Sequence, residues 1–295
     1  MVMDDLSINF YPKTETLEDL GRGGLRLIQP RNKFRFGQDS VVLAYFAAIN
    51  TTASKNLKVA DLCAGSGVIG LLYAARCRQV PVLTVAVEHD PEMFSVLERN
   101  ACLNARYNIL PVHANLAEDV ESWQVDQKHK VTPGDFKHSF QVVLVNPPYS
   151  HINKNKFIEN DMARHEITGD LHAYLKAAVN LLRPLGQLFI CFRPERLDEL
   201  LLAAANLSLR ATLIRPVQAF PDSKPKVFLA KFRWQGRANS LKWQPTLYTG
   251  DGHVKSYPTT DDGGIFSEFA SIYTGGSCLK SEEMQQNIKV IDALN

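Results

Sequence analysis

The sequence lacks a hydrophobic run long enough to cross a membrane. A spanning helix needs about 18 or more consecutive apolar residues, and no such run occurs in the 295 residues. The N-terminus, Met1-Val2-Met3-Asp4-Asp5, is acidic and is therefore also unlike a secretory leader. We expect a cytoplasmic protein that makes no contact with membranes.

Cysteine is scarce, and its positions lack the spacing of a metal or redox site. The sequence has 5 cysteines, far apart and mostly inside apolar segments. Zinc and thiol-redox sites need pairs of cysteines a few residues apart. We therefore expect buried thiols and no bound metal. The positions are Cys63, Cys77, Cys102, Cys191 and Cys278.

The chain also lacks a strong charge of either sign. Its formal net charge is +2, and with 45% hydrophobic and 22% charged residues it has the balance of an ordinary globular protein. Between residues 193 and 242 bases clearly outnumber acids, and this stretch forms either a solvated surface or a surface for phosphate groups. The bases there are Arg193, Arg196, Arg210, Arg215, Lys224, Lys226, Lys231, Arg233, Arg237 and Lys242.

From Leu57 onward, short apolar runs bounded by turn residues alternate with stretches of helical periodicity. This alternation predicts an α/β fold, a doubly wound and mostly parallel sheet of seven strands. The last two strands are joined by a proline-rich connection without a helix, so we expect them to form an antiparallel edge hairpin. The predicted strands are 57–62, 82–88, 109–113, 140–145, 186–192, 209–215 and 227–234. The predicted helices are 67–78, 91–105, 116–122, 170–183 and 194–206.

These βα units define the predicted main domain, residues 56–236. The segment 1–55 shows a strand-like run and then an amphipathic helix from about Asp39, which is a candidate N-cap. The polar stretch 124–139 is predicted to be a surface insertion. Beyond residue 236 the chain is rich in Gly, Thr, Ser and Asp, so we expect an extension, 237–295, that is flexible in part and ends in a helix at 281–293.

A glycine-rich turn follows the first predicted strand. Asp61 and Ala64 precede Gly65, Gly67 and Gly70, and such glycines let the backbone turn sharply and approach a ligand. The same G-x-G-x-x-G pattern occurs in dinucleotide-binding enzymes, which are the competing interpretation. The carboxylate of Asp61 would repel a pyrophosphate, however, and would attract a cation.

S-adenosylmethionine suits this turn because it carries an ammonium group and a sulfonium and has no phosphate. Asp61 would bind its amino-acid end, directly or through water, and Glu88 would accept hydrogen bonds from the ribose hydroxyls. The alternative is that both acids cap helices. Asn115, which follows the third strand, would either bind the adenine amino group or cap the next helix.

The fourth predicted strand runs into Asn146-Pro147-Pro148-Tyr149, at the sheet edge where ligands bind in such folds. Prolines have no N–H, so the loop offers acceptors, namely the Asn146 carboxamide oxygen and the Pro147 carbonyl. An NH2 group on a planar molecule fits these acceptors, and the ring of Tyr149 can stack on it. The alternative is a rigid turn with a buried tyrosine.

At these residues the chain resembles the class I S-adenosylmethionine-dependent methyltransferases, which have a Rossmann-like fold. The tetrapeptide is similar to that of enzymes that methylate adenine N6 in nucleic acids or glutamine in release factors. Further stretches resemble the bacterial valine-tRNA adenine-N6 methyltransferases, and the resemblance covers roughly residues 20 to 275. These stretches are Gly24 to Gln29, Phe34 to Leu43, Ala163 to Glu166, and Leu181 to Leu188.

The resemblance implies methylation of adenine N6 in RNA, with tRNA as the expected nucleic-acid substrate, since an unpaired base can be splayed into a pocket. The alternatives are methylation of a glutamine amide in a protein such as a release factor, and a non-catalytic RNA-binding module. Glutamine methyltransferases usually carry a helical domain ahead of the fold, for which the segment before the first strand is short. The implied cofactor residues include Gln29, Phe34, Phe36, Asp39 and Asn146, and the implied adenine-binding residues are Asn146 and Tyr149.

Overall fold

A computed structural model of the chain describes residues 9–21, 23–51, 56–77, 83–125, 131–148, 171–236 and 240–249. The last residue of the predicted acceptor loop, Tyr149, lies outside these ranges, as do Ala163 to Glu166, Cys278 and the predicted helix 281–293. The main-domain elements predicted from the sequence all overlap the described ranges.

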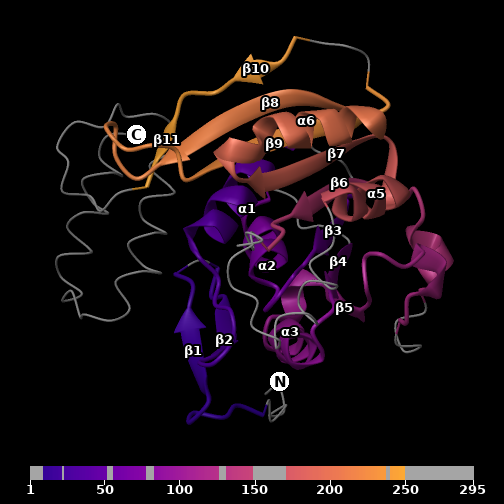
Figure 1. The fold of residues 1–295 in the computed structure, drawn as a ribbon. Coiled ribbons are helices and arrows are strands. Elements are labelled where there is room, and N and C mark those ends of the chain that lie inside the picture. The colour runs from indigo at the N-terminus through magenta and orange to yellow at the C-terminus, as the bar shows by residue number, and fades with distance from the viewer. Residues whose placement is uncertain are drawn as a thin grey trace, which may run out of the picture.

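The centre of the fold is a large, mostly parallel sheet (Figure 1). Its strand order is β10-β8-β9-β7-β6-β3-β4-β5, with β11 paired to β8 as well. Strands β5, β4, β3, β6 and β7 are parallel to one another, whereas β9 is antiparallel to both β7 and β8. The bounds are β3 (Lys58–Leu62), β4 (Leu83–Glu88), β5 (Ile109–His113), β6 (Phe140–Val145), β7 (Leu182–Phe192), β8 (Leu209–Gln218), β9 (Val227–Trp234), β10 (Lys242–Trp243) and β11 (Leu247–Tyr248).

Helices cover both faces of the sheet, as a doubly wound fold requires. In β6, Val142 and Leu144 belong to one apolar core, and Val143 and Val145 belong to the other, because successive side chains of a strand point to opposite faces. Helices α1 (Gln38–Asn50), α2 (Val68–Arg76) and α3 (Pro91–Leu103) contribute to the first core, and α5 (Leu171–Leu181) and α6 (Leu197–Asn206) to the second. None of the helices in the described ranges is long and apolar enough to cross a bilayer.

The predicted fold class is confirmed, and so is the antiparallel pairing of the last two predicted strands. One helix start is explained by its sequence. Asp90 accepts hydrogen bonds from Glu92 N at 2.9 Å and Met93 N at 3.0 Å, and Pro91 occupies the first helical position of α3, where a missing N–H costs nothing.

Other local predictions are wrong. The helix expected over 116–122 is only a short 3-10 turn, Val120–Ser122. Strand β7 begins at Leu182, earlier than predicted, and so shortens the preceding helix. Helix α1 is not amphipathic, because Ser40 to Ala47 are all buried between the sheet and α2.

The stretch 124–139 is more than a surface insertion where it is described. Gln124 forms a bridge with His113 at the end of β5, and Pro133–Phe136 form a 3-10 helix with a capping box of Thr132 and Asp135. The ring of Phe136 is 1% exposed and belongs to the second core. This buried ring fastens the segment to the main domain.

The segment 1–55, for which one strand-like run was predicted, holds two strands, and two short strands near the other end of the described chain were not predicted. An antiparallel hairpin of β1 (Glu15–Asp19) and β2 (Arg26–Pro30) precedes α1, and Figure 1 shows it beside α3. At the other end, β10 and β11 add to the outer side of β8. Residues 240–249 are therefore part of the sheet.

Candidate functional site

The turn between β3 and α2 depends on its glycines. Gly65 has φ 56° and Gly67 has φ 85°, backbone conformations that residues with a side chain rarely adopt. A Cβ on Gly67 would lie 2.6 Å from Leu97 Cδ1, and a Cβ on Gly70 would lie 3.2 Å from Asp61 Oδ2. A Cβ on Gly65 would meet no atom closer than 4.0 Å. Gly67 and Gly70 thus serve packing, while a Cβ on Gly65 would make only an ordinary contact with Met93.

Asp61 lies beneath this turn, at the carboxyl end of β3. Its Oδ2 accepts a hydrogen bond from Gly70 N at 2.8 Å, while its Oδ1 has no hydrogen-bond partner among the described residues. The side chain is fully buried, and burial raises the pKa of Asp61 to about 7, helped by the negative charge of Glu88 and opposed by the Gly70 N–H. A buried carboxylate oxygen without a partner is suited to a cation or a water molecule.

Glu88 ends the neighbouring strand, β4, and binds the backbone of the same turn. Its Oε2 accepts a hydrogen bond from Gly65 N at 2.7 Å, and its Oε1 accepts from His89 N and Asp90 N, both at 2.8 Å. Each carboxylate oxygen can accept about two hydrogen bonds, so the remaining capacity lies mainly on Oε2. This oxygen could accept one ribose hydroxyl beside the Gly65 amide.

The other predicted cofactor residues of the main domain border this turn. Ala64 donates its N–H to Val87 O at 3.0 Å, which ties the turn to β4, and its carbonyl accepts from Gly67 N at 2.8 Å, which closes the turn between β3 and α2. Asn115 accepts a hydrogen bond from Ala117 N at 3.0 Å. The Asn115 side chain therefore caps a tight turn, not the α-helix that we expected there, and its predicted contact with adenine stays a prediction.

The predicted acceptor loop leaves β6, which pairs directly with β3. The loops after β3 and β6 therefore meet at one edge of the sheet, beside the point where the strand order reverses, and open α/β sheets bind ligands there. Asn146 Nδ2 donates to Ser40 Oγ at 3.3 Å, Pro147 is buried, and Pro148 is exposed. Ser40 belongs to α1, so the N-terminal segment reaches the acceptor loop.

The predicted cofactor residues of the N-terminal segment lie in β2, in the connection that follows it and in the first turn of α1. Gln29 is 2% exposed, and its Oε1 accepts from Phe36 N at 3.1 Å. Phe36 packs against the first core, whereas Phe34 is 72% exposed. Asp39 is not the N-cap of α1, since Gly37 holds that position and Asp39 Oδ1 accepts from Ser40 N.

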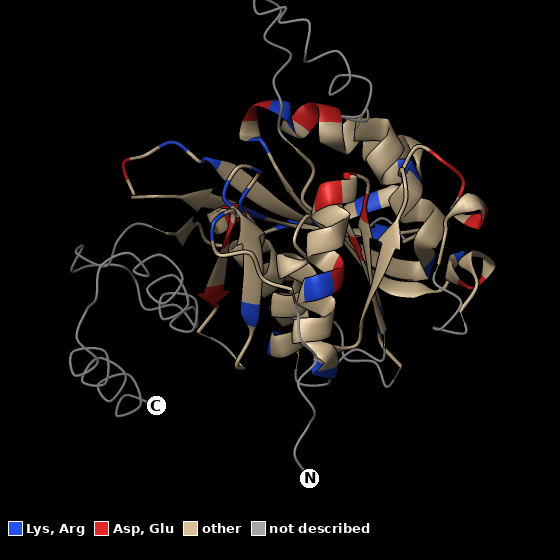
Figure 2. Cartoon of the chain, turned by 90° about the horizontal axis from the view of Figure 1, so that it is seen from below, with Lys and Arg blue, Asp and Glu red and all other residues tan. Residues whose placement is uncertain are grey.

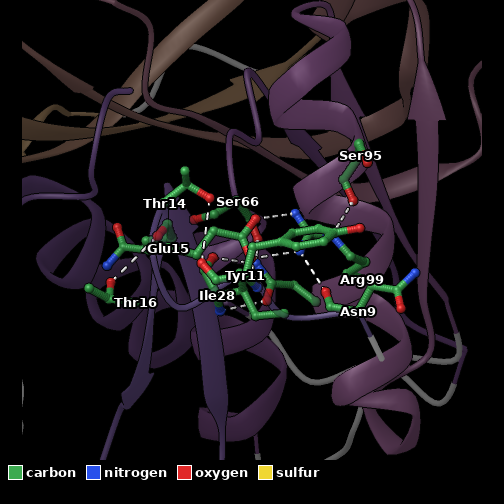
Figure 3. A network of polar contacts seen from close by, with 11 residues as sticks. Asn9, Tyr11, Thr14, Glu15, Thr16, Ile28, Ser66, Ser95 and Arg99 are labelled. Carbon is green, nitrogen blue, oxygen red and sulfur yellow. Dashed lines mark hydrogen bonds and ion pairs between the residues drawn. The ribbon is translucent and has the colours of Figure 1, made fainter. Parts of the chain in front are cut away.

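The hairpin β1–β2 is held against α3 by a network of polar contacts (Figure 3). Arg99 donates two hydrogen bonds to Glu15, Nη2 to Oε1 at 2.6 Å and Nη1 to Oε2 at 2.9 Å. Burial alone would raise the pKa of Glu15, but hydrogen bonds from Arg99 and from Tyr11 N outweigh it, and the pKa of Glu15 lies below its ordinary value. On the same helix, Asn100 and Asn104 bind the backbone of β2.

Sequence reasoning missed Ser40, Asn100 and Asn104. Asparagine in the middle of a helix is unfavourable unless its side chain has a specific partner. The spacing of Asn100 and Asn104, which places both on one side of α3, was therefore the signal available. Their partners are far away in the sequence and could not be identified from it.

The basic stretch 193–242 is structural in part. Arg215 is 4% exposed and donates from Nε to Pro245 O at 3.0 Å, and Lys231 donates to Asn50 O at 2.7 Å. Burial, with the charge of Arg233, lowers the pKa of Lys231. Arg210, Lys224, Lys226 and Lys242 are exposed.

The chain is similar to several known proteins. A family model described as "Conserved hypothetical protein 95" matches residues 22–177. A Porphyromonas gingivalis protein named tRNA1(Val) (adenine(37)-N6)-methyltransferase is 27% identical over 202 residues, 68% of this chain and 74% of that protein. A protein of the same name from Trichodesmium erythraeum is 24% identical over 226 residues, 75% of this chain and 87% of its own.

Solved structures show the same fold. One is a predicted O-methyltransferase, protein Atu636 from Agrobacterium tumefaciens, with a TM-score of 0.54 and 21% identity over 79% of this chain and 97% of that one. Another is TYW2 from M. jannaschii in complex with AdoMet, with a TM-score of 0.50 and 18% identity over 77% of this chain and 89% of that one.

This fold and these relatives define the class as that of the S-adenosylmethionine-dependent methyltransferases, which confirms the class and the cofactor predicted from the sequence. Within that class, the chain belongs to the family described as "Conserved hypothetical protein 95".

Proposed function

We propose that this protein transfers a methyl group from S-adenosylmethionine to the exocyclic N6 of an adenine in RNA, and that the RNA is a tRNA. The observation that carries the proposal is the junction of β3 and β6, which brings the turn at Gly65 and the acceptor loop at Asn146 to one edge of the sheet. The names of the curated relatives support the same reaction.

The residues of the glycine turn fit the cofactor. Asp61 Oδ1 is a buried acceptor without a partner among the described residues, Glu88 Oε2 retains accepting capacity, and Gly65 leaves space beside both. We propose that Asp61 holds the ammonium group, directly or through water, that Glu88 holds the ribose, and that Asn115 approaches the adenine. Gln29, Phe36 and Asp39 would close the pocket from the N-terminal side.

When bound, S-adenosylmethionine supplies an electrophilic methyl group on a positively charged sulfur. The acceptor nitrogen of adenine is a poor nucleophile because its lone pair is delocalised into the ring. Hydrogen bonds from its two hydrogens to Asn146 Oδ1 and the Pro147 carbonyl would increase the electron density on nitrogen and direct the lone pair toward the methyl group. Tyr149 would stack on the flat base.

Ser40 would position Asn146. Its hydroxyl accepts from Asn146 Nδ2, and this bond fixes the orientation of the carboxamide at the start of the acceptor loop. Transfer to N6 would break the carbon–sulfur bond of the bound cofactor and leave S-adenosylhomocysteine. N6 then loses one proton, which passes to solvent, so the chain needs no strong base.

The test is methyl transfer from labelled S-adenosylmethionine to unmodified tRNA, followed by mass spectrometry of the nucleosides. Asn146→Ala should lower transfer by roughly 100-fold or more, the usual effect of losing one positioned polar group, while cofactor affinity stays within about threefold. Ser40→Ala keeps Asn146 and removes only its hydrogen-bond partner, so it should lose less activity.

Several outcomes would contradict the proposal. Label on a nucleoside other than N6-methyladenosine would mean that the acceptor is wrong. Label on a release factor and none on RNA would show that the loop holds a glutamine amide, since both acceptors present an NH2 on a planar group. Cofactor binding without transfer to either would favour an RNA-binding module.

A further inference from the structure

Asn100, in the last turn of α3, binds two separate segments of the chain. Its side chain is 0% exposed. Oδ1 accepts from Ile28 N at 2.7 Å, and Nδ2 donates to Ile28 O at 3.0 Å and to Ser66 O at 2.9 Å. A carboxamide has two N–H donors and one acceptor oxygen, and all three groups are used. One side chain therefore holds both strand β2 and the glycine turn.

Asn104, one helical turn further along α3, offers an internal comparison. It pairs with β2 in the same way, because its Oδ1 accepts from Arg26 N at 3.2 Å and its Nδ2 donates to Arg26 O at 2.8 Å. Its other contact stays within the helix, at Asn100 O. Asn104 therefore anchors the hairpin but does not touch the glycine turn.

The direction of the Ser66 carbonyl affects the shape of the glycine turn. Ser66 lies between Gly65 and Gly67, whose positive φ angles give the turn its shape, and its peptide group links directly to Gly67. A hydrogen bond from Asn100 fixes the direction of that peptide, and Figure 3 shows Ser66 and Ile28 close together within the network. The position of the turn therefore depends on the position of β2.

The same strand leads toward the acceptor loop. Gln29 follows Ile28 and accepts from Phe36 N, and the helix that begins after Phe36 carries Ser40, which contacts Asn146. Movement of β2 would thus affect the glycine turn through Asn100 and the start of α1 through Gln29. Both segments border the site where the cofactor is expected.

We propose that Asn100 is a positioning residue for S-adenosylmethionine that couples docking of the β1–β2 hairpin to cofactor binding. The inference rests on the proposed location of the cofactor at the glycine turn. If the two events are coupled, each favours the other by the same factor. Cofactor binding should then strengthen the contact between Asn100 and Ile28, and loss of that contact should weaken cofactor binding, whereas the contact between Asn104 and Arg26 is not part of this link.

The test compares Asn100→Ala with Asn104→Ala in the full chain, with the affinity for S-adenosylmethionine measured by calorimetry. Asn100→Ala should weaken binding by about tenfold, within the usual range for coupled sites, and Asn104→Ala by less than about twofold, although both lower the melting temperature. In steady-state kinetics, Asn100→Ala should raise KM for the cofactor and leave kcat at saturation and KM for RNA nearly unchanged.

A measurement on the unmodified protein covers the case in which Asn100→Ala does not fold. Hydrogen exchange of the Ile28 amide, which donates to Asn100, should slow by about fivefold or more when S-adenosylmethionine is added, the lower end of typical coupling. Slower exchange at residues 64–67 with no change at Ile28 would overturn the inference.

Equal losses of affinity in Asn100→Ala and Asn104→Ala, or no loss in either, would also overturn it. These measurements use the cofactor alone. A protein that shows the expected difference between the two variants but does not methylate RNA would contradict the proposed function and leave the role of Asn100 intact.

Discussion

Asp61 combines two properties that are unfavourable together, complete burial and a carboxylate oxygen without a partner among the described residues. Its folded pKa of about 7 lies above the ordinary value of 3.8, so the folded chain binds this proton more tightly than the unfolded chain. The free energy of unfolding should therefore fall as pH rises from about 4 to 7. A bound cation would stabilise the charged carboxylate and so offset this loss of stability at higher pH.

The affinity for S-adenosylmethionine should accordingly rise with pH. Between pH 6 and pH 8 the carboxyl of Asp61 changes from mostly neutral to mostly charged, and a ligand that prefers the charged form should bind about tenfold more tightly at the higher pH. Calorimetry across this range measures the effect.

Asp61→Asn is the control, because its carboxamide keeps an oxygen for the Gly70 N–H and cannot titrate. Its pH profile should show only the ligand's own amino group, whose pKa is near 8. Equal profiles for the two proteins would mean that Asp61 does not face the ammonium group.

At the scale of elements, two glycines of the turn between β3 and α2 should have different roles. We expect Gly67 to be needed mainly for folding and Gly65 mainly for cofactor binding. Gly67→Ala adds a Cβ 2.6 Å from Leu97 Cδ1 at φ 85°, and should lower the free energy of unfolding by about 2 to 4 kcal/mol, the sum of backbone strain and overpacking. Gly65→Ala meets no atom closer than 4.0 Å and should cost only about 1 to 2 kcal/mol of strain. Urea unfolding measures both.

The effects of the two substitutions on cofactor affinity should have the opposite order to their effects on stability. The Cβ at residue 65 enters the space proposed for S-adenosylmethionine, so Gly65→Ala should weaken binding more than Gly67→Ala does, measured on protein that is still folded. If Gly65→Ala binds the cofactor normally, the ligand does not approach the turn at that point.

The bounds of a strand could be predicted from the sequence where burial of its apolar side chains determines them. Strand β6 is an apolar run buried on both faces, and its predicted bounds, 140–145, agree with the structure. Strand β1, Glu15–Asp19, has no such run and exists because it pairs with β2 and binds Arg99. Strands β10 and β11 are too short to leave a pattern.

The residues of the candidate site also fall into two groups, those that the local sequence identified and those that it could not. Asp61, Gly65 and Glu88 are neighbours of strand ends, so local sequence identified them. The Asn100–Ile28 and Asn146–Ser40 contacts join residues 72 and 106 positions apart. No local pattern contains such pairings, because they depend on how the hairpin and α1 pack on the main domain.

At the scale of the whole molecule, the described part of the chain carries charges of both signs. Figure 2 shows basic and acidic segments interspersed over the chain, in keeping with the net charge of +2. Lys224 and Lys226 lie in the connection after β8, a strand that runs in the same direction as β6. These exposed lysines are therefore at the sheet edge that carries Asn146, while exposed Arg210 is near the opposite end of β8.

If RNA approaches that edge, the two lysines should contact phosphates and Arg210 should not. Lys224→Ala combined with Lys226→Ala should weaken tRNA binding and reduce the slope of log affinity against log salt by about 1 to 2, since each phosphate contact contributes roughly 0.7 to 0.9. Arg210→Ala, which also removes an exposed positive charge, should leave the slope unchanged. A filter-binding series over several salt concentrations measures it, and an equal change in both proteins would mean that the loss reflects overall charge and not an RNA path across this edge.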